Sequence, residues 1–350
     1  MQQNNLRELL DQLVQSSQLV PAREYWLVRT NNGSYYDSFL NHGIVALKMP
    51  YADGGFITRL RNENLADSAA VTYVKDHFLS IINNPDNANN PVLEELRTPT
   101  TLSNRASQLY MFCSKMKSGD IILIPSEGAT QISIGIVEGD DMFNDEAIAR
   151  QYPIARRVRW VNQIPKYRLE PGLYRALGAH QAMANITKYA ESLERNFGSC
   201  FMIDGVCHYV LTINSAEVSA EQFFGMGQTL LQTLSRLSTM YDLGINVQDI
   251  NLSMNLNSPG KVDFKSTLAI AFLIMAILTA CSDGQLEYEG LTQFPTDIFN
   301  SLVELVSQPF REDQEITQMG DSIQNYLNGM DAQSVEKWNE NSIRARLGDE

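Results

Sequence analysis

The sequence predicts an α+β protein built from two domains, and three observations lead to that class. Its 350 residues exceed the usual size of a single domain. Segments with strand-like and helix-like hydrophobic periodicity alternate along the chain. Charge is also uneven, because residues 1–200 carry 20 basic and 21 acidic side chains whereas residues 201–350 carry 7 and 20. We therefore expect two α+β domains with different roles.

The N-terminal segment, residues 1–22, is predicted to be an amphipathic helix. Within "LRELLDQLVQ" the apolar residues recur at helical spacing, and Pro21 ends the pattern. The helix either packs on its own domain or pairs with another chain, so a homo-oligomer stays open. The start "MQQNNLRELL" has no basic region followed by a long apolar stretch, so no secretory signal is expected.

Residues 23–165 are predicted to hold most of the strands of the first domain. The strand signals are "EYWLVRT", "IVALKM", "GDIILIP", "ISIGIVEGD" and "RRVRWV". Helical periodicity marks residues 65–82 and "ASQLYMFCSKM", and the Asn- and Pro-rich residues 83–91 are predicted to form an exposed loop. These signals therefore predict a strand-rich domain with additional helices.

Residues 166–198 are predicted to be a helical connector, and residues 199–350 a second α+β domain with an acidic helical tail. The second domain is expected to start with a strand, a turn and a strand in "SCFMIDGVCHYVLTI". A long amphipathic helix follows and is expected to end at Gly244, since glycine favours the left-handed conformation that closes helices. The stretch "INVQDINLSMNLNSP" alternates as a strand does.

The most apolar stretch, residues 266–282, is predicted to be a buried helix rather than a membrane span. It has 17 uncharged residues, whereas a transmembrane helix needs about 20. Acidic side chains follow it and no basic cluster flanks it. The alternative is a membrane-associated defence effector with a transmembrane helix at residues 266–282. Four cysteines without a CxxC pair favour reduced thiols and a cytoplasmic protein.

The first half resembles a known family. The order "YWLVRTNNGSYYDSFLNHGIVAL", "LYMFCSKMKSGDIILIP", "ISIGIVEGD" and "RRVRWVNQIP" is similar to the EVE-like domain of the PUA superfamily, found in bacterial restriction-system proteins. The resemblance covers residues 23–165. It implies a small, twisted β-barrel with a nucleic-acid pocket, often for a modified base. By this resemblance the chain is a non-enzymatic nucleic-acid reader or sensor in anti-phage defence, acting with a separate effector protein. The family's Trp-containing wall after "VA" is replaced here by Leu47 to Met49.

Aromatic and basic residues in this half are the candidates for nucleic-acid contact, because bases stack on aromatic rings and phosphates attract cations. The strongly acidic second half repels phosphate and is not expected to bind it. The alternative for each aromatic is core packing, and for each cation a solvated strand edge. The candidate ligand-binding residues are Trp26, Arg29, Tyr35, Tyr36, Phe39 and Trp160. The candidate contacts to a DNA or RNA backbone are Arg156, Arg157, Arg159, Lys166 and Arg168.

A catalytic site is not expected, although one weak pattern stays open. Asp249, Asp263 and Lys265 match the order of an acid followed by D-x-K, in which two carboxylates and an ammonium surround Mg²⁺ and a water. The alternative function is therefore a magnesium-dependent nuclease. The chain has no HxxxH, GxSxG or GxxxxGK[ST] motif, and no resident cofactor or metal is expected.

Overall fold

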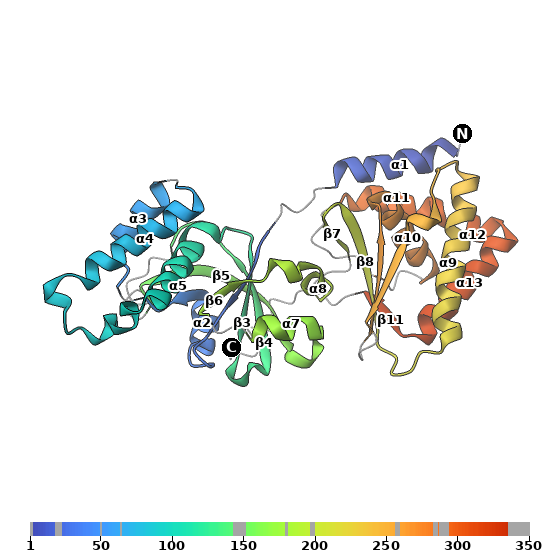
Figure 1. Cartoon of the computed structure of the whole chain (residues 1–350). Helices are drawn as coiled ribbons and strands as arrows, with labels where there is room; N and C mark the ends of the chain where they lie inside the picture. Colours follow the sequence, from blue (N-terminus) through green and yellow to red (C-terminus); the bar gives the residue numbers. More distant parts are fainter. Residues whose placement is uncertain are drawn as a thin grey trace. The chain divides into compact units, whose positions relative to one another are not determined.

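The computed structural model describes residues 3–17, 23–49, 51–63, 65–142, 152–178, 181–196, 200–255, 260–282, 286 and 294–334. The chain divides into two compact units. We call them the 23–190 unit and the 191–337 unit, the second of which also includes residues 1–22 (Figure 1). The chain is thus mixed α and β throughout, as the sequence predicts.

A six-stranded sheet forms the centre of the 23–190 unit. Its order is β2-β5-β4-β3-β1-β6, with β1 and β3 parallel and every other neighbour antiparallel. The strands are β1 Tyr25–Val28, β2 Ile44–Leu47, β3 Ile121–Pro125, β4 Gln131–Val137, β5 Ile154–Pro165 and β6 Met183–Asn185. The predicted strands of this half are present, and β6 is added from the segment expected to be a helical connector. The connector prediction is therefore wrong at β6, because this strand pairs with β1 through Trp26, Leu27 and Val28.

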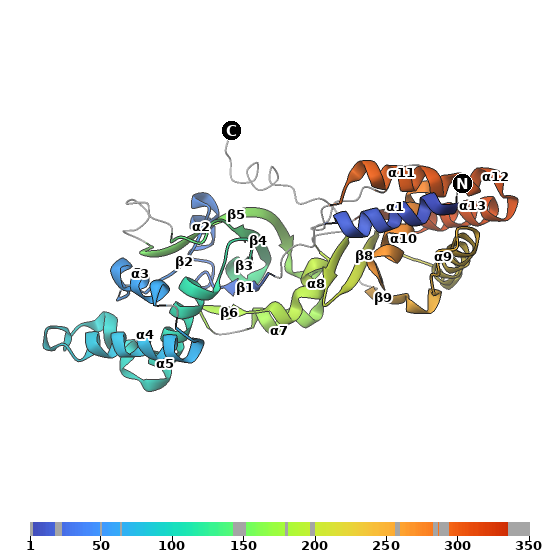
Figure 2. The same ribbon diagram turned by 90° about the horizontal axis from the view of Figure 1, so that it is seen from above.

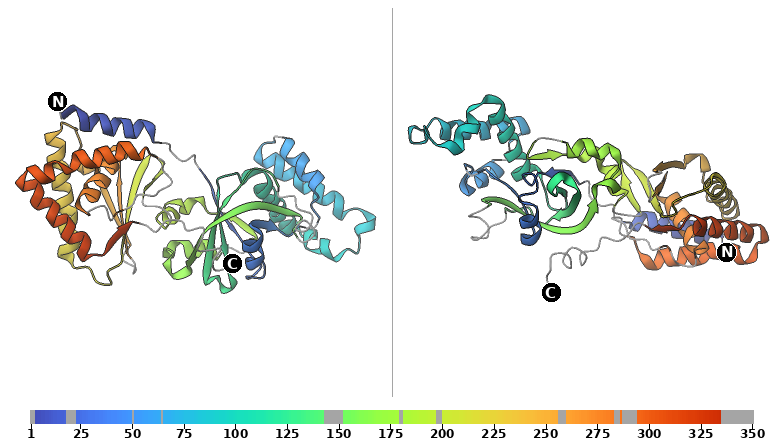
Figure 3. Two further views of the ribbon diagram at one scale, coloured as in Figure 1. Left: turned by 180° about the vertical axis from the view of Figure 1, so that it is seen from behind. Right: turned by 90° about the horizontal axis from the view of Figure 1, so that it is seen from below.

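The helices of this unit lie on different sides of the curled sheet, with those of residues 54–110 together at one side, as two further views show (Figures 2 and 3). They are α2 Tyr36–His42, α3 Gly54–Asn62, α4 Asp67–Ile82, α5 Pro99–Tyr110 and α7 Pro171–Leu177, and α5 continues as a π-helical turn, Met111–Lys115. Short 3₁₀ turns occupy Pro85–Asn87, Pro91–Arg97, Glu127–Ala129, Lys166–Arg168 and Thr187–Tyr189.

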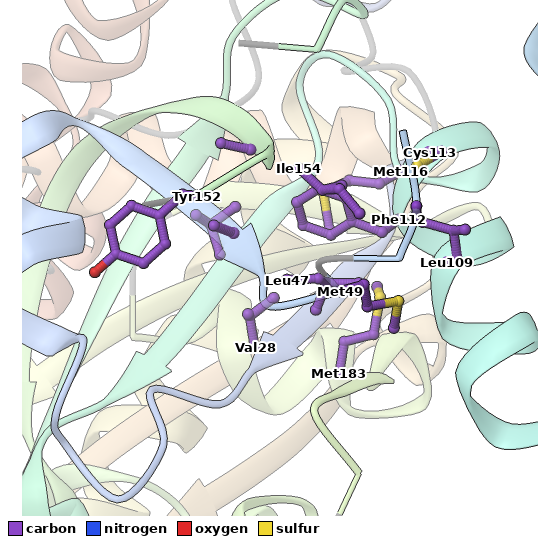
Figure 4. Close-up of a cluster of buried hydrophobic side chains, with 14 of the residues drawn as sticks. Val28, Leu47, Met49, Leu109, Phe112, Cys113, Met116, Tyr152, Ile154 and Met183 are labelled. Atoms are coloured by element: carbon purple, nitrogen blue, oxygen red, sulfur yellow. The ribbon is translucent and has the colours of Figure 1, made fainter. Parts of the chain in front are cut away.

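The core of this unit lies inside the curl of the sheet. Figure 4 shows Leu47, the last residue of edge strand β2, and Met49, just beyond it, close to Met183 in β6 at the opposite edge. Phe112 and Met116 from the end of α5 complete the same apolar cluster. All of β1 and β2 is buried, so these strands are covered on both faces. The sheet thus forms a half-barrel with a packed interior.

The 191–337 unit has an antiparallel sheet in the order β11-β8-β10-β9, with β7 also paired to β8. Its strands are β7 Cys200–Ile203, β8 Val206–Ile213, β9 Asn251–Asn255, β10 Gly260–Ser266 and β11 Ala332–Ser334. Its helices are α1 Gln3–Ser16, α8 Ala190–Glu194, α9 Ala220–Met240, α10 Leu268–Cys281, α11 Thr296–Ser307, α12 Pro309–Glu312 and α13 Gln314–Gly329. Helix α9 ends at Met240, not at Gly244, although Gly244 does have a positive φ of 66°.

The apolar segment predicted to be a buried helix is α10, and the structure confirms its burial. Leu273 and Ile274 are among eleven buried residues of this helix, which α1, α11 and α13 contact. Residues Leu6, Leu10 and Leu13 of α1 belong to the same core, so the N-terminal helix packs within its own chain. In the described part of the chain, every helix is too short or too polar to cross a membrane.

Candidate functional site

A pocket of about 580 Å³ opens in the 23–190 unit where β1 and β2 end. Its wall is formed by polar and charged side chains from three segments that are distant in sequence. The residues that give it its chemical character are Arg29, Asn31, Asn32, Tyr35, Lys48, Glu95 and Arg105. The apolar residues Ala46, Leu47, Val92 and Ala182 complete the lining. The combination offers cations, amides and one aromatic ring to a ligand.

A left-handed turn after β1 builds one side of this pocket. Asn31, Asn32 and Gly33 all have positive φ, at 51°, 54° and 91°. Asparagine tolerates this conformation better than most residues, and glycine adopts it without strain. At position 33 a Cβ atom would lie 2.6 Å from the backbone of Glu127, so only glycine fits. Such unusual backbone is often found at binding sites.

The turn is anchored at both ends. The backbone N–H of Tyr35 donates to Thr30 O at 2.9 Å, and the Thr30 hydroxyl donates to Pro125 O at 2.5 Å. Arg29 is held by its Nη2, which donates to Leu177 O at 2.6 Å, and by its backbone N–H, which donates to Ala182 O. The wall of the pocket is therefore preorganised.

The charges of the pocket favour an anion. The lining contains three cations, Arg29, Lys48 and Arg105, and one carboxylate, Glu95. Arg105 Nη2 lies 2.7 Å from Glu95 Oε2, and Tyr51 donates its hydroxyl to Glu95 Oε1 at 3.2 Å. Burial and the negative charge of Glu95 raise the pKa of Tyr51, so this hydroxyl keeps its proton as a donor. The carboxylate is thereby neutralised, and the pocket keeps a net positive charge.

Of the six predicted ligand-binding residues, the structure places Arg29 and Tyr35 at the pocket and four in the core. Trp26 is 1% exposed, Phe39 1%, Tyr36 7% and Trp160 8%. Tyr35 lines the pocket and packs its ring on Phe39, with centroids 6.0 Å apart. The aromatic cage expected from the sequence is thus reduced to one ring.

The core position of the other aromatic rings has clear physical causes. Trp26 Nε1 donates to the buried carboxylate of Asp120 at 2.9 Å, and that carboxylate also accepts the backbone N–H groups of Glu24 and Lys117. Trp160 Nε1 donates to Phe39 O at 3.1 Å. The Tyr36 hydroxyl is within 2.6 Å of both Ser133 Oγ and Gln163 Nε2. These polar atoms are already used within the protein.

The basic residues of β5 divide between its two faces. The side chain of Arg156 has no exposed surface, and it donates to three backbone carbonyls, those of Phe112, Met116 and Gly139. The prediction that Arg156 contacts the phosphates of DNA or RNA is therefore wrong, and this side chain instead stabilises the fold. Burial lowers the pKa of Arg156. Arg157 and Arg159 are exposed, and Arg159 pairs with Glu138 at 3.2 Å.

Lys166 and Arg168 lie just beyond β5, in the 3₁₀ turn Lys166–Arg168. Arg168 is exposed, and the Lys166 ammonium lies 5.3 Å from the ring centroid of Tyr174 on α7. Arg168 is thus accessible to solvent, and Lys166 is partly buried. The structure does not bring them to the wall of the pocket.

A second polar cluster lies on the sheet of the 191–337 unit. His208 Nδ1 lies 3.0 Å from Asp263 Oδ2, and Arg195 Nε donates to the same oxygen at 2.8 Å. Glu191 on α8 accepts hydrogen bonds from Arg195 and from Lys265 Nζ, the latter at 2.5 Å. His208 and Asp263 are almost fully buried, and the ring of Phe201 stacks on His208 with centroids 4.6 Å apart.

This cluster is best explained as an ion-pair network that fixes α8 to the sheet. Glu191, His208 and Asp263 bring potential metal-binding atoms within 4.8 Å of one another. However, the two carboxylates already pair with Arg195 and Lys265, which balance their charges without a metal. Burial would raise the pKa of Glu191, but hydrogen bonding to Lys265 and the charge of Arg195 outweigh it and lower the pKa.

The predicted nuclease triad is only partly brought together. Asp263 and Lys265 share one face of β10 and join the same network. Asp249 lies in the exposed turn Val247–Asp249, where its carboxylate accepts a hydrogen bond from Asn246 Nδ2 at 3.4 Å. It is not a member of the network, and its place beside the D-x-K pair is taken by Glu191.

Sequence reasoning missed several pocket residues, namely Asn31, Asn32, Lys48 and Arg105. The signal for the first two was present, because "TNNG" after a strand is typical of a left-handed turn. Lys48 and Arg105 lie in segments that are remote from this turn in sequence, and only the curl of the sheet brings them together.

Comparison with known proteins adds one family. The family model described as "Domain of unknown function (DUF8426)" matches residues 65–175. The match runs from the start of α4 into α7 and lies within the 23–190 unit. It includes Arg105 but not the turn that carries Arg29 and Tyr35. Neither the curated proteins nor the solved structures provide a match.

Proposed function

We propose that the 23–190 unit binds nucleic acid and receives one nucleotide in the pocket beside the left-handed turn. The observation that carries this proposal is the lining of the pocket. It contains three cations and one carboxylate, which pairs with Arg105, together with the ring of Tyr35. A nucleotide matches this lining, because its phosphate attracts cations and its base presents a π-face to aromatic side chains.

The amide groups at the pocket supply a means of reading the base. Asn31 and Asn32 carry both donors and acceptors, which can pair with the edge of an unstacked base. Their turn is held in place by Gly33 and Thr30, so little ordering is needed when a ligand binds. Preorganised donors and acceptors favour discrimination between bases.

The curled sheet is consistent with a variant of the PUA-like barrel, and the resemblance to EVE-like domains supports the choice of nucleic acid. The roles in anti-phage defence and with a separate effector rest on that resemblance alone. A cytoplasmic location rests on the cysteine pattern, to which the structure adds that all four cysteines are buried and outside any disulfide.

The test uses the full chain and fluorescently labelled DNA and RNA oligonucleotides, with and without modified bases, at several salt concentrations. Lys48→Glu should weaken binding to every oligonucleotide and reduce the slope of log affinity against log salt by about 0.7–0.9, the value for one lost phosphate contact. Lys117→Glu is the matched control, because Lys117 is an exposed lysine of the same unit outside the pocket.

Tyr35→Ala should lower the affinity for a preferred base by about 1–3 kcal/mol, since a stacking ring is lost. If Lys48→Glu and Lys117→Glu have equal effects, the pocket is not the binding site. If the wild-type chain binds no oligonucleotide at low salt, the proposed function is wrong.

A further inference from the structure

An exposed surface beyond β5 combines aromatic and basic side chains. We call it the 166–175 surface and define it by Lys166, Tyr167, Arg168, Tyr174 and Arg175. Tyr167 is 69% exposed and Tyr174 is 37% exposed, and both arginines are exposed. Large aromatic side chains are usually buried, so a strongly exposed tyrosine between two cations suggests a contact surface.

The backbone of this surface is firmly held. Leu169 and Leu173 are 1% and 2% exposed and anchor the segment in the unit. Lys166 donates its backbone N–H to Thr130 O at 2.9 Å, and Pro171 begins α7. The exposed rings therefore project from a fixed support, which lowers the entropy lost when a ligand binds.

The electrostatics of this segment favour an anionic ligand. Residues 152–178 contain six cations and one carboxylate, Glu170. The one cation that is fully buried is Arg156, so the other five remain near the surface. The Lys166 ammonium lies over the Tyr174 ring at 5.3 Å, which keeps a positive charge beside an aromatic face.

The 166–175 surface is connected to the pocket through Arg29. This side chain lines the pocket, and its Nη2 donates to Leu177 O at the end of α7, which also carries Tyr174 and Arg175. A strand with one nucleotide in the pocket therefore has a basic, aromatic surface within reach of its neighbouring nucleotides.

We propose that the 166–175 surface binds the single-stranded flank of the nucleic acid, with Tyr167 and Tyr174 as stacking platforms and Arg168 and Arg175 as phosphate contacts. This inference rests on the proposed function of the pocket. Stacking on exposed rings beside cations is tolerant of sequence, so this surface contributes affinity while the pocket contributes discrimination.

The experiment measures anisotropy of a labelled 12-nucleotide single strand and of a blunt duplex with the full chain. Tyr167→Ala should weaken binding of the single strand about 5- to 150-fold, the loss that corresponds to one stacked base. It should change duplex binding far less, since bases in a duplex are already stacked. Phe224→Ala is the matched control, because Phe224 is 68% exposed on α9 in the other unit.

Arg168→Ala and Arg175→Ala should each reduce the salt slope for the single strand by about 0.7. Arg7→Ala, an exposed arginine on α1, should leave the slope unchanged. All substituted side chains are exposed, so folding is expected to be retained, and circular dichroism checks it.

If Tyr167→Ala binds the single strand as well as Phe224→Ala does, the inference about the 166–175 surface is wrong. The proposed function still holds in that case if Lys48→Glu weakens binding. If the wild-type chain binds no nucleic acid, both fail together. Binding of an acidic peptide that depends on Tyr167, without binding of the single strand, would instead assign this surface to an acidic protein partner.

Discussion

Arg156 and Arg157 are neighbours in sequence but point to opposite faces of β5. Replacing Arg156 should therefore lower the stability of the fold, whereas replacing Arg157 should lower the affinity for nucleic acid. Arg156 is buried and donates to Phe112 O at 3.3 Å, Met116 O at 2.8 Å and Gly139 O at 2.9 Å. Methionine at this position fills the space of the side-chain stem but leaves three carbonyls without these donors.

The expected loss for Arg156→Met is about 3–5 kcal/mol of unfolding free energy, the range for breaking a buried charged network. Arg157→Met changes an exposed side chain, so its expected effect is within about 0.5 kcal/mol. With a slope of about 2 kcal/mol per molar urea, the unfolding midpoint of Arg156→Met should fall by roughly 2 M.

Urea unfolding followed by tryptophan fluorescence is the appropriate assay, because Trp26 and Trp160 are both buried in this unit. Nucleic-acid affinity should be measured on the folded proteins. Arg157→Met should bind more weakly than the wild type, and Arg156→Met should bind with unchanged affinity. A loss of stability below 1 kcal/mol for Arg156→Met would refute the assignment of a structural role to this arginine.

Two further predictions concern the ion-pair network of the 191–337 unit. Asp263→Asn should destabilise this unit by about 3–5 kcal/mol, because Arg195 then loses its buried counter-charge, and thermal unfolding measures the effect; an unchanged melting temperature would contradict the account. The pKa of Glu191 is lowered in the folded protein, so its stabilising contribution is present above the ordinary value of 4.5 and is lost as pH falls through the lower, folded value. Glu191→Gln should therefore flatten the decrease of stability with pH below about 4.5, and equal acid sensitivity of the variant and the wild type would refute this.

Much of the secondary structure was predictable from local patterns, and α10 shows why. An apolar segment without a polar face can only be covered on all sides, and its length is too short for a bilayer. Strand β6 was not predictable, since its three residues have no strand pattern of their own and are defined by pairing with β1. The end of α9 at Met240 also differs from the expected Gly244, because the chain turns left-handed two residues earlier: Asp242 has a φ of 51°, and the backbone N–H of Leu243 donates to Ser238 O at 2.9 Å, which closes the helix.

The candidate site was less predictable, because alternation along a strand does not show which face is covered. Trp26 was a candidate pocket residue with core packing as the alternative, and the structure shows the alternative: β1 is covered on both faces and the indole N–H is paired with Asp120, 94 residues away. Asp263 and Lys265 share one face of β10 because they are two residues apart, whereas Glu191 joins them from a helix more than 70 residues earlier in the chain. Such long-range pairs leave no mark in a local pattern.

Photocrosslinking tests the central claim, that the 23–190 unit takes a nucleotide into the pocket, most directly. The full chain would be irradiated with a 4-thiouridine-containing oligonucleotide, digested with trypsin and analysed by mass spectrometry. Residues 30–48 form one tryptic peptide that contains the left-handed turn, Tyr35 and Lys48. The account predicts that crosslinks concentrate in this peptide and are lost in Tyr35→Ala, whereas crosslinks confined to residues 191–337 would contradict it.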